Sequence, residues 1–280
     1  MSRSMLNDAT ASALSVSSSA SEQQLGTYRP RPWAVVIPFK GAPNGKSRLR
    51  GVSDERRARL ALAFLVDTVE AVRSVDLVAQ VVIVSDSAQV RSLGRFGAGY
   101  RMTQSVTPIR IVSDSGGGLN AAVLKGIGHA RRAIPTALVA AMTSDLPCLD
   151  GNDLRFALKS AAQLDRSFVP DSLGAGTTMI TVGPGVLPSP RFGISSRLAH
   201  EQAGHRLIEL SEHSGLRFDI DTVADLRSAG SDGRSVGPST LAAIRELERS
   251  PRPELLASLH PDSHTTDELD GVLTTLQESR

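Results

Sequence analysis

The stretch Trp33-Ala34-Val35-Val36-Ile37-Pro38 is a short run of apolar residues that lacks the polar alternation of a half-exposed strand. Such runs are typical of strands that are buried on both faces of a parallel sheet. Three further runs have the same character and lie at residues 80–84, 109–112 and 137–142. We therefore expect a mostly parallel central sheet.

Helical patterns occupy the intervals between these runs. Ser53 is a favourable N-cap residue, and after it apolar residues recur at near-helical spacing: Leu60, Phe64, Leu65, Val69 and Val72. A second helix is expected over residues 121–133. Alternating strands and helices predict an α/β fold in a single domain. In such a fold, ligands bind beyond the carboxyl ends of the strands, where Lys40, Asp86, Asp114 and Asp145 are expected.

The composition argues for a small anionic ligand. The chain has 280 residues, 40% of them apolar, which is enough for a sizeable core. Lys and Arg number 31 against 29 Asp and Glu, so the net charge is only +2, and the basic residues are scattered. Aromatic residues make up 4% of the chain and leave few surfaces on which bases could stack. We therefore expect no nucleic-acid partner.

The polar ends of the chain and its single cysteine indicate which residues fold and in which compartment the protein works. Residues 1–30 are rich in Ser and Ala, and we expect them to form a disordered leader. Residues 249–280 are expected to form a polar, disordered tail. The folded domain is expected at residues 31–248. Cys148 is the only cysteine, so no intramolecular disulfide is possible and no thiolate cluster can hold a metal. With no signal-peptide core and no membrane-length apolar run, a cytoplasmic protein without a membrane partner is expected.

A basic, glycine-containing loop follows the first predicted strand. It spans residues 40–48 and contains Lys40, Gly41, Gly45, Lys46 and Arg48. Glycines let a ligand approach the backbone, and the cations can hold triphosphate oxygens. The spacing is one residue short of a Walker A loop, and an ordinary solvated loop is an equally good interpretation.

A second glycine-rich loop, Gly116-Gly117-Gly118, precedes the helix that starts near Asn120. It could bring a base or ribose against a helix N-terminus, with Asn120 contacting a purine edge. The alternative is a flexible turn in which Asn120 caps the helix.

Aspartates follow two predicted strand ends. Asp145 comes after the most apolar run, and Pro147 forces an extended exit, so its carboxylate is expected over the sheet edge. Asp219 and Asp221 are two residues apart, which places both on one side of an extended segment. Mg²⁺ is a hard ion that takes oxygen ligands, so these three residues are candidate ligands. Asp221 is equally an N-cap signal for the helix that follows, and the two roles could hold together.

Two further loops, starting at Asp171 and Arg191, carry small and hydroxylic residues that suit a phosphate or carboxylate, although each is more often an ordinary turn. The histidines at 200, 205 and 213 lack metal-site spacing, and Cys148 has no neighbouring cation or base that would activate it.

Taken in order, the motifs resemble those of the CofC/FbiD guanylyltransferases over about residues 32–226. The matching segments are Lys-Ser-Arg-Leu at 46–49, Gly-Leu-Asn at 118–120, Ser-Asp-Leu-Pro at 144–147, Asp-x-x-Gly-x-Gly-Thr at 171–177, Arg-Phe-Gly at 191–193 and Asp-Ile-Asp-Thr at 219–222. The resemblance implies a compact Rossmann-like nucleotidyltransferase fold, similar to that of the molybdopterin guanylyltransferases. It also implies transfer of GMP from GTP to a phosphorylated three-carbon acid, during biosynthesis of the deazaflavin coenzyme F420.

The resemblance also implies roles for individual residues. The catalytic residues would be Lys46 and Asp145. Metal ligands for Mg²⁺ would be Asp145, Asp219 and Asp221, and Lys46, Arg48 and Asn120 would contact the nucleotide. From their positions in the two glycine-containing loops, Lys40 and Gly118 are further predicted nucleotide contacts. The acceptor, phosphoenolpyruvate in the actinobacterial branch that this chain resembles, would bind to Thr177, Gly193 and Ser196. A downstream transferase that takes the product is an implied partner.

Several alternatives stay open from the sequence. The acceptor could be 2-phospho-L-lactate, which differs from phosphoenolpyruvate in the planarity of one carbon and is discriminated by pocket shape rather than by a motif. A metal-dependent nucleotide-sugar glycosyltransferase would also use an aspartate. A non-catalytic GTP-binding regulator would bind nucleotide without turnover.

Overall fold

A mostly parallel sheet forms the centre of the computed structural model, which describes residues 31–41, 53–93 and 107–249, all within one compact unit. Its strands are β1 (Trp33–Pro38), β2 (Val78–Val84), β3 (Ile109–Val112), β4 (Leu138–Met142), β5 (Arg166–Pro170), β6 (Thr177–Val182) and β7 (Arg206–Leu207), in the spatial order β3-β2-β1-β4-β6-β5-β7. Every neighbouring pair is parallel except those that involve β6. The predicted α/β class and parallel sheet are confirmed.

Helices cover both faces of the sheet. They are α1 (Asp54–Arg73), α2 (Ala88–Leu93), α3 (Leu119–Ala133), α4 (Gly151–Ala161), α5 (Ser196–Gln202), α6 (Val223–Ser231) and α7 (Pro238–Arg249), with a short 3₁₀ turn, η1 (Gly215–Arg217). The side chain of Ser53 accepts a hydrogen bond from the backbone N–H of Arg56, which confirms the predicted N-cap of α1.

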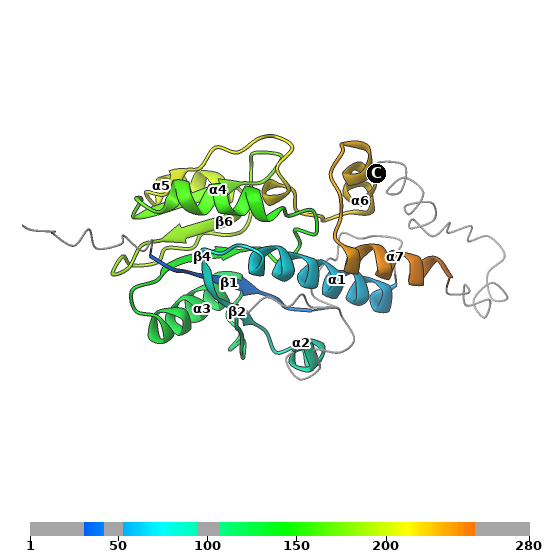
Figure 1. Cartoon of the computed structure of the whole chain (residues 1–280), viewed down its shortest axis with the longest axis horizontal. Helices are drawn as coiled ribbons and strands as arrows, with labels where there is room; N and C mark the ends of the chain where they lie inside the picture. The colour runs from blue at the N-terminus through cyan, green and yellow to red at the C-terminus, as the bar shows by residue number, and fades with distance from the viewer. Residues whose placement is uncertain (1–30, 42–52, 94–106, 250–280) are drawn as a thin grey trace, which may run out of the picture. The chain divides into compact units, whose positions relative to one another are not determined.

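Alternation along β1 creates two separate cores. Val35 and Ile37 pack with α1 and α4 on one face, whereas Ala34 and Val36 pack with α3 on the other. Figure 1 shows α3 on the opposite side of the sheet from α1 and α4. A Cβ atom on Gly126 of α3 would lie 2.3 Å from Cγ1 of Val36, so glycine allows this helix to approach β1 closely. The observed strands are therefore buried on both faces, as their unbroken apolar sequences predict.

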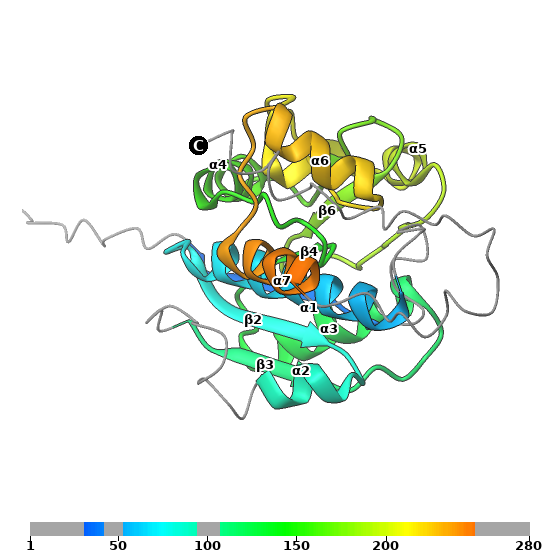
Figure 2. The ribbon, with the colours of Figure 1, turned by 90° about the vertical axis from the view of Figure 1, so that its right-hand side faces the viewer.

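A buried carboxylate holds α7 against α1. Asp67, on α1, accepts hydrogen bonds from the backbone N–H groups of Ser239 (2.9 Å) and Thr240 (2.8 Å) in the first turn of α7. Burial raises the pKa of Asp67, and the hydrogen bonds from Thr240 and Ser239 oppose that change. The two helices lie side by side in Figures 1 and 2. The N–H of Gly237 also donates to the carbonyl of Pro147, so α7 is tied to the loop that follows β4.

We expect Asp67→Asn to lower the free energy of unfolding by about 2 kcal/mol, because the two N–H groups donate to different carboxylate oxygens. Asparagine replaces one of these oxygens with an NH₂ group that cannot accept, which leaves one N–H without an acceptor. Urea denaturation measures this change. The matched control is Asp76→Asn, which breaks only the exposed pair with Arg155 and is expected to cost less than about 1 kcal/mol. Equal urea midpoints for the two variants would contradict the capping role of Asp67.

Among the described residues, no helix is both long enough and apolar enough to cross a membrane.

Candidate active site

A cavity of about 260 Å³ opens at the carboxyl ends of β1 and β4. Its walls come from the end of β1 and the loop after it, one residue of α1, the first turn of α3, the segment after β4 and the segment that leads to α6. The lining residues are Pro38, Phe39, Lys40, Gly41, Ala61, Leu119, Ala122, Thr143, Ser144, Asp145 and Asp221. Of the predicted nucleotide-binding residues, Lys40 lines this cavity and is exposed to solvent. The cavity thus lies where ligands bind in open parallel sheets.

Backbone contacts on both sides hold Asp145 in place. The N–H of Thr143 donates to the carbonyl of Thr178 (2.9 Å), which continues the pairing of β4 with β6. The N–H of Leu146 donates to the hydroxyl of Thr68 on α1 (3.2 Å). Leu146 itself is fully buried. These anchors leave the Asp145 side chain facing the cavity, as its position after the strand predicts.

The second aspartate segment is pinned to the first. Ile220 is fully buried, and its N–H donates to the carbonyl of Asp145 (3.0 Å). Because side chains alternate along an extended segment, burial of Ile220 turns Asp219 and Asp221 away from the core. The prediction that Asp221 is an N-cap is wrong: Thr222 caps α6 and forms a reciprocal capping box with Asp225.

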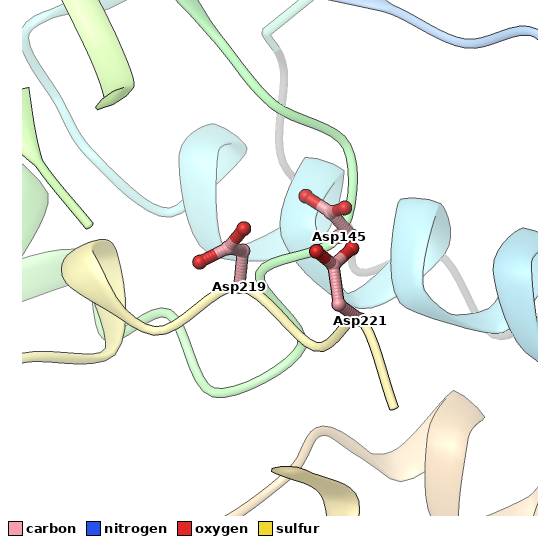
Figure 3. A group of neighbouring side chains, drawn as sticks. All are labelled: Asp145, Asp219 and Asp221. Atoms are coloured by element: carbon pink, nitrogen blue, oxygen red, sulfur yellow. The ribbon is translucent and has the colours of Figure 1, made fainter. Parts of the chain in front are cut away.

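The three predicted carboxylates meet at the cavity. Asp145, Asp219 and Asp221 each offer an oxygen, and these oxygens lie within 4.8 Å of one another (Figure 3). Three like charges this close repel one another unless a cation lies among them. Their hard oxygen donors suit a divalent ion of the Mg²⁺ type, and the adjoining cavity leaves room for a triphosphate. The cluster therefore fits a divalent metal ion.

The start of α3 joins the cavity to a neighbouring loop. Gly118 is the N-cap residue and has φ 90°, a left-handed conformation that favours glycine. The alternative that Asn120 caps the helix is therefore wrong. Instead, the Asn120 amide donates to the carbonyl of Phe192 (3.0 Å) and accepts from its N–H (2.8 Å). Its proposed contact with the nucleotide stays a prediction.

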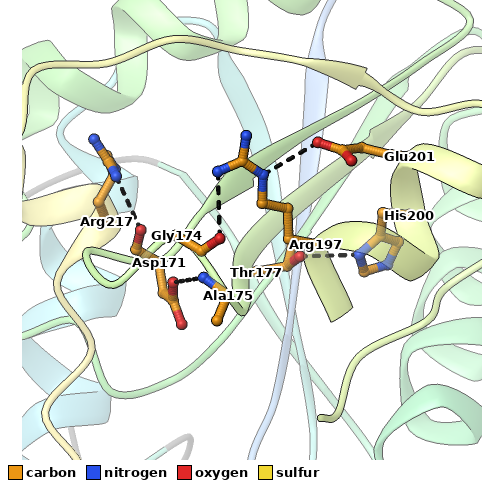
Figure 4. Close-up of polar contacts among 8 residues, drawn as sticks. All are labelled: Asp171, Gly174, Ala175, Thr177, Arg197, His200, Glu201 and Arg217. Carbon is orange, nitrogen blue, oxygen red and sulfur yellow. Dashed lines mark hydrogen bonds and ion pairs between the residues drawn. The ribbon is translucent and has the colours of Figure 1, made fainter. Parts of the chain in front are cut away.

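The three residues predicted to hold the acceptor lie in connected segments. Thr177 begins β6, Gly193 lies in the turn before α5, and Ser196 begins α5. The N–H of Ser196 donates to the carbonyl of Gly193 (3.1 Å), and the N–H of Arg197 donates to Ala175, two residues before Thr177. Figure 4 shows α5 facing the start of β6. The fold thus brings the three residues into one neighbourhood.

The Asp171 loop forms a turn and contributes no carboxylate to the metal cluster. Its carboxylate accepts hydrogen bonds from the N–H groups of Ala175 (2.9 Å) and Gly176 (2.8 Å), and its carbonyl accepts one from Arg217 (Figure 4). The structure therefore favours the turn interpretation for Asp171 itself. The turn precedes Thr177 and sets where β6 begins.

Two predicted residues, Lys46 and Arg48, lie outside the described residues.

Cys148 is buried, and burial raises the pKa of its thiol to about 12, so it is not a nucleophile near neutral pH.

Sequence reasoning missed the residue that connects the segments predicted to hold the acceptor. His200 is fully buried on α5; its Nδ1 lies 3.0 Å from the hydroxyl oxygen of Thr177, and its Nε2 accepts a hydrogen bond from the N–H of Arg191 (2.8 Å). No sequence motif surrounds His200, and only the positions of its partners, 23 and 9 residues away, reveal its contacts.

His200 should make the protein sensitive to acid. Burial, followed by repulsion from His205, lowers the pKa of His200 from 6.5 to about 4; the Ser196 carbonyl opposes this change and Arg191 adds to it. Because the unfolded chain then takes up a proton more readily than the folded protein does, the stability present above pH 6.5 is lost as the pH falls toward 4.

We expect the urea midpoint of the wild type to fall over this pH range, and that of His200→Gln to fall less steeply. The urea midpoint of the variant should still depend on pH, although less strongly, because burial lowers the pKa of His205 as well. Parallel pH profiles for the two proteins would contradict the neutral state of His200.

Comparison with known proteins agrees with this geometry. Residues 33–230 match the family described as "Guanylyl transferase CofC like". Two relatives named phosphoenolpyruvate guanylyltransferase are similar: one from Streptomyces coelicolor is 41% identical over 77% of this chain and 97% of its own length, and one from Streptosporangium roseum is 38% identical over 77% and 91%.

Solved structures agree on the fold. A nucleotidyl transferase from Methanothermobacter thermautotroptrophicus matches with a TM-score of 0.51 at 19% identity, over 72% of this chain and 97% of its own. A protein from Desulfovibrio desulfuricans G20, assigned as a nucleotide-diphospho-sugar transferase, matches with a TM-score of 0.54 at 17% identity, over 89% and 98%. At these identities the likeness shows the fold alone. The family match and the two relatives together establish that this chain belongs to the CofC-like guanylyl transferase family.

Proposed function

We propose that this protein transfers the guanylyl group of GTP to phosphoenolpyruvate and releases pyrophosphate. The observation that carries the proposal is the meeting of three carboxylates within 4.8 Å at the cavity rim. The name that its relatives carry supports the choice of GTP and phosphoenolpyruvate. The product is a guanosine diphosphate ester of the enol acid, as in coenzyme F420 biosynthesis.

The metal site would hold Mg²⁺. Its ligands would be Asp145, Asp219 and Asp221, and the ion would offset negative charge on the phosphates of the substrate.

The remaining groups bind and align the two substrates. Lys40 supplies positive charge at the cavity wall, and the N-terminus of α3 presents backbone N–H groups beside Leu119. Thr177, Gly193 and Ser196 supply hydroxyl and backbone donors for an acidic acceptor. We retain Lys46 and Arg48 as predicted nucleotide contacts, with Lys46 as a catalytic residue.

The reaction needs alignment more than it needs a base. An acceptor phosphate oxygen attacks the α-phosphorus of GTP, a new P–O bond forms, and the bond to the bridging oxygen of pyrophosphate breaks. A phosphate monoester is already largely ionised at neutral pH, because its second pKa is about 6, so no side chain has to remove a proton. This agrees with the lowered pKa of His200, which makes its ring a weak base, and with the buried Cys148 thiol, which stays protonated near neutral pH.

Purified protein incubated with Mg²⁺, GTP and either phosphoenolpyruvate or 2-phospho-L-lactate tests the proposal. We expect pyrophosphate and the enol diphosphate ester, identified by mass, with phosphoenolpyruvate. Turnover with phospholactate alone would reassign the acceptor. GTP binding without pyrophosphate release would favour a regulator, and hydrolysis of a nucleotide sugar in a parallel reaction would favour a glycosyltransferase.

We also propose that the reaction takes place in the cytoplasm and that a downstream transferase consumes the product. The new phosphoanhydride bond makes GMP a good leaving group, so the phosphorylated acid is activated for transfer.

A further inference from the structure

The ring nitrogens of His200 have different partners, and these partners determine where its proton lies. A backbone N–H can only donate, so Nε2, which accepts from Arg191 at 2.8 Å, must carry a lone pair. In a neutral imidazole the proton then lies on Nδ1. Burial favours this neutral form, since it lowers the pKa of His200 to about 4.

The proton on Nδ1 determines how the Thr177 hydroxyl is used. The oxygen of Thr177 lies 3.0 Å from Nδ1 and accepts a hydrogen bond from His200 that the Ser196 carbonyl shares (Figure 4). Its own hydrogen must point away from the ring. None of the described residues accepts a hydrogen bond from this hydroxyl, so its hydrogen has no acceptor among them.

The same ring holds the segment that contains Gly193, another predicted acceptor residue. Through Nε2 it fixes the N–H of Arg191, and the amide of Asn120 fixes both backbone groups of Phe192, the next residue. Gly193 follows directly. His200 packs edge-on against the Phe192 ring with centroids 5.3 Å apart, so packing and hydrogen bonding restrict the ring together.

We propose that His200 is a positioning residue that makes Thr177 a hydrogen-bond donor to an anionic oxygen of the acceptor. The inference rests on the proposed function, because it takes Thr177 as an acceptor contact. Phosphate and carboxylate oxygens accept hydrogen bonds, and a threonine hydroxyl that was free to rotate could offer them a lone pair instead. His200 removes that unproductive orientation before the acceptor arrives.

The tautomer can be tested on the wild-type protein without substrate. Long-range ¹H–¹⁵N correlation spectra of ¹⁵N-histidine-labelled protein near pH 7 distinguish a protonated ring nitrogen from an unprotonated one. The proposal requires a protonated Nδ1 and an unprotonated Nε2 at His200, with His200→Gln used to assign the signal. A proton on Nε2 would overturn it.

The positioning role can be tested with a double-mutant cycle on acceptor kinetics. Thr177→Val and His200→Gln are each expected to raise the KM for phosphoenolpyruvate about fivefold, the effect of one hydrogen bond, and to change the KM for GTP less than twofold. Gln can place an acceptor near the Nε2 position, so it preserves the bond to Arg191 and removes the donor to Thr177. The double variant should then be no worse than either single variant.

Controls separate this proposal from general damage and from failure of the proposed function. Thr177→Ser keeps the hydroxyl and should have a smaller effect than Thr177→Val, and His213→Gln removes an exposed histidine outside the site. The positioning role would be overturned if the increase in the KM for phosphoenolpyruvate in the double variant were the product of the two single increases. Equal increases in the KM values for phosphoenolpyruvate and GTP would overturn it as well. A wild type that releases no pyrophosphate with any three-carbon acceptor would instead overturn the proposed function, while the spectrum still reports the tautomer.

Discussion

Replacing Asp145 with asparagine is expected to lower kcat for pyrophosphate release by about 10³-fold, an effect of about 4 kcal/mol on the barrier. Asp145 is the member of the carboxylate cluster that follows the end of strand β4, and its side chain lines the cavity. The substitution keeps the size of the side chain and removes its charge, so the fold should be retained while affinity for a divalent cation falls.

Two measurements check this expectation. Pyrophosphate release gives the rate, and calorimetric titration with Mn²⁺, in place of Mg²⁺, gives the metal affinity without any substrate. Asp219→Asn and Asp221→Asn are expected to change both quantities in the same direction. The matched control is Asp165→Asn, an exposed aspartate outside the cluster, which should leave both unchanged. Full turnover by the Asp145 variant would rule out the cluster as the catalytic metal site.

Gly215→Ala is expected to destabilise the protein by about 3 kcal/mol and to weaken metal binding as well. A Cβ atom at this position would lie 1.8 Å from the carbonyl oxygen of Cys148 and 2.5 Å from its carbonyl carbon. Both are backbone atoms that cannot rotate away. Cys148 follows the Asp145 loop, whereas Gly215 precedes Asp219, so relief of the clash would move the two aspartate segments apart.

The anchors around Gly215 leave little room for adjustment. Its N–H and the Ser214 hydroxyl both donate to the Asp153 carboxylate on α4, and the carbonyl of Leu216 accepts a hydrogen bond from Thr178 on β6 (2.6 Å). The turn η1 is thus fixed on two sides, and the added methyl group has to displace the Cys148 segment or break these bonds.

Thermal unfolding and Mn²⁺ titration test the two parts of this expectation. The melting temperature should fall by about 8 °C for a loss of about 3 kcal/mol. Gly183→Ala is the matched control: its Cβ would also meet a backbone carbonyl oxygen, that of Asp165, but at an ordinary 3.6 Å. Unchanged metal affinity in a folded Gly215→Ala variant would show that the spacing of the two segments does not depend on this glycine.

The sheet could be predicted from sequence because burial on both faces requires uninterrupted apolar strands. The run Trp33–Pro38 satisfies this requirement within six residues, and the helix after Ser53 shows its buried stripe just as locally. Asp145 was predictable for a related reason: a strand that must end in a parallel sheet places its next polar residue at the ligand-binding edge.

Contacts between distant segments escaped sequence reasoning because residue spacing carries no information about them. Asn120 has the residue type of an N-cap and a helix start beside it, yet its amide pairs with Phe192, 72 residues away. Thr222 rather than Asp221 caps α6, since the Asp221 side chain lies with the other carboxylates.

The sequence by itself determined the α/β class, the four apolar strands of the parallel part of the sheet and the three carboxylates, because these depend on apolar periodicity and on residues that follow strands. Only the tertiary structure decided that His200 joins Thr177 to Arg191, and that Gly215 sets the gap to Cys148. Those features depend on how segments far apart in the chain approach one another, and close packing decides that approach at the scale of a single methyl group.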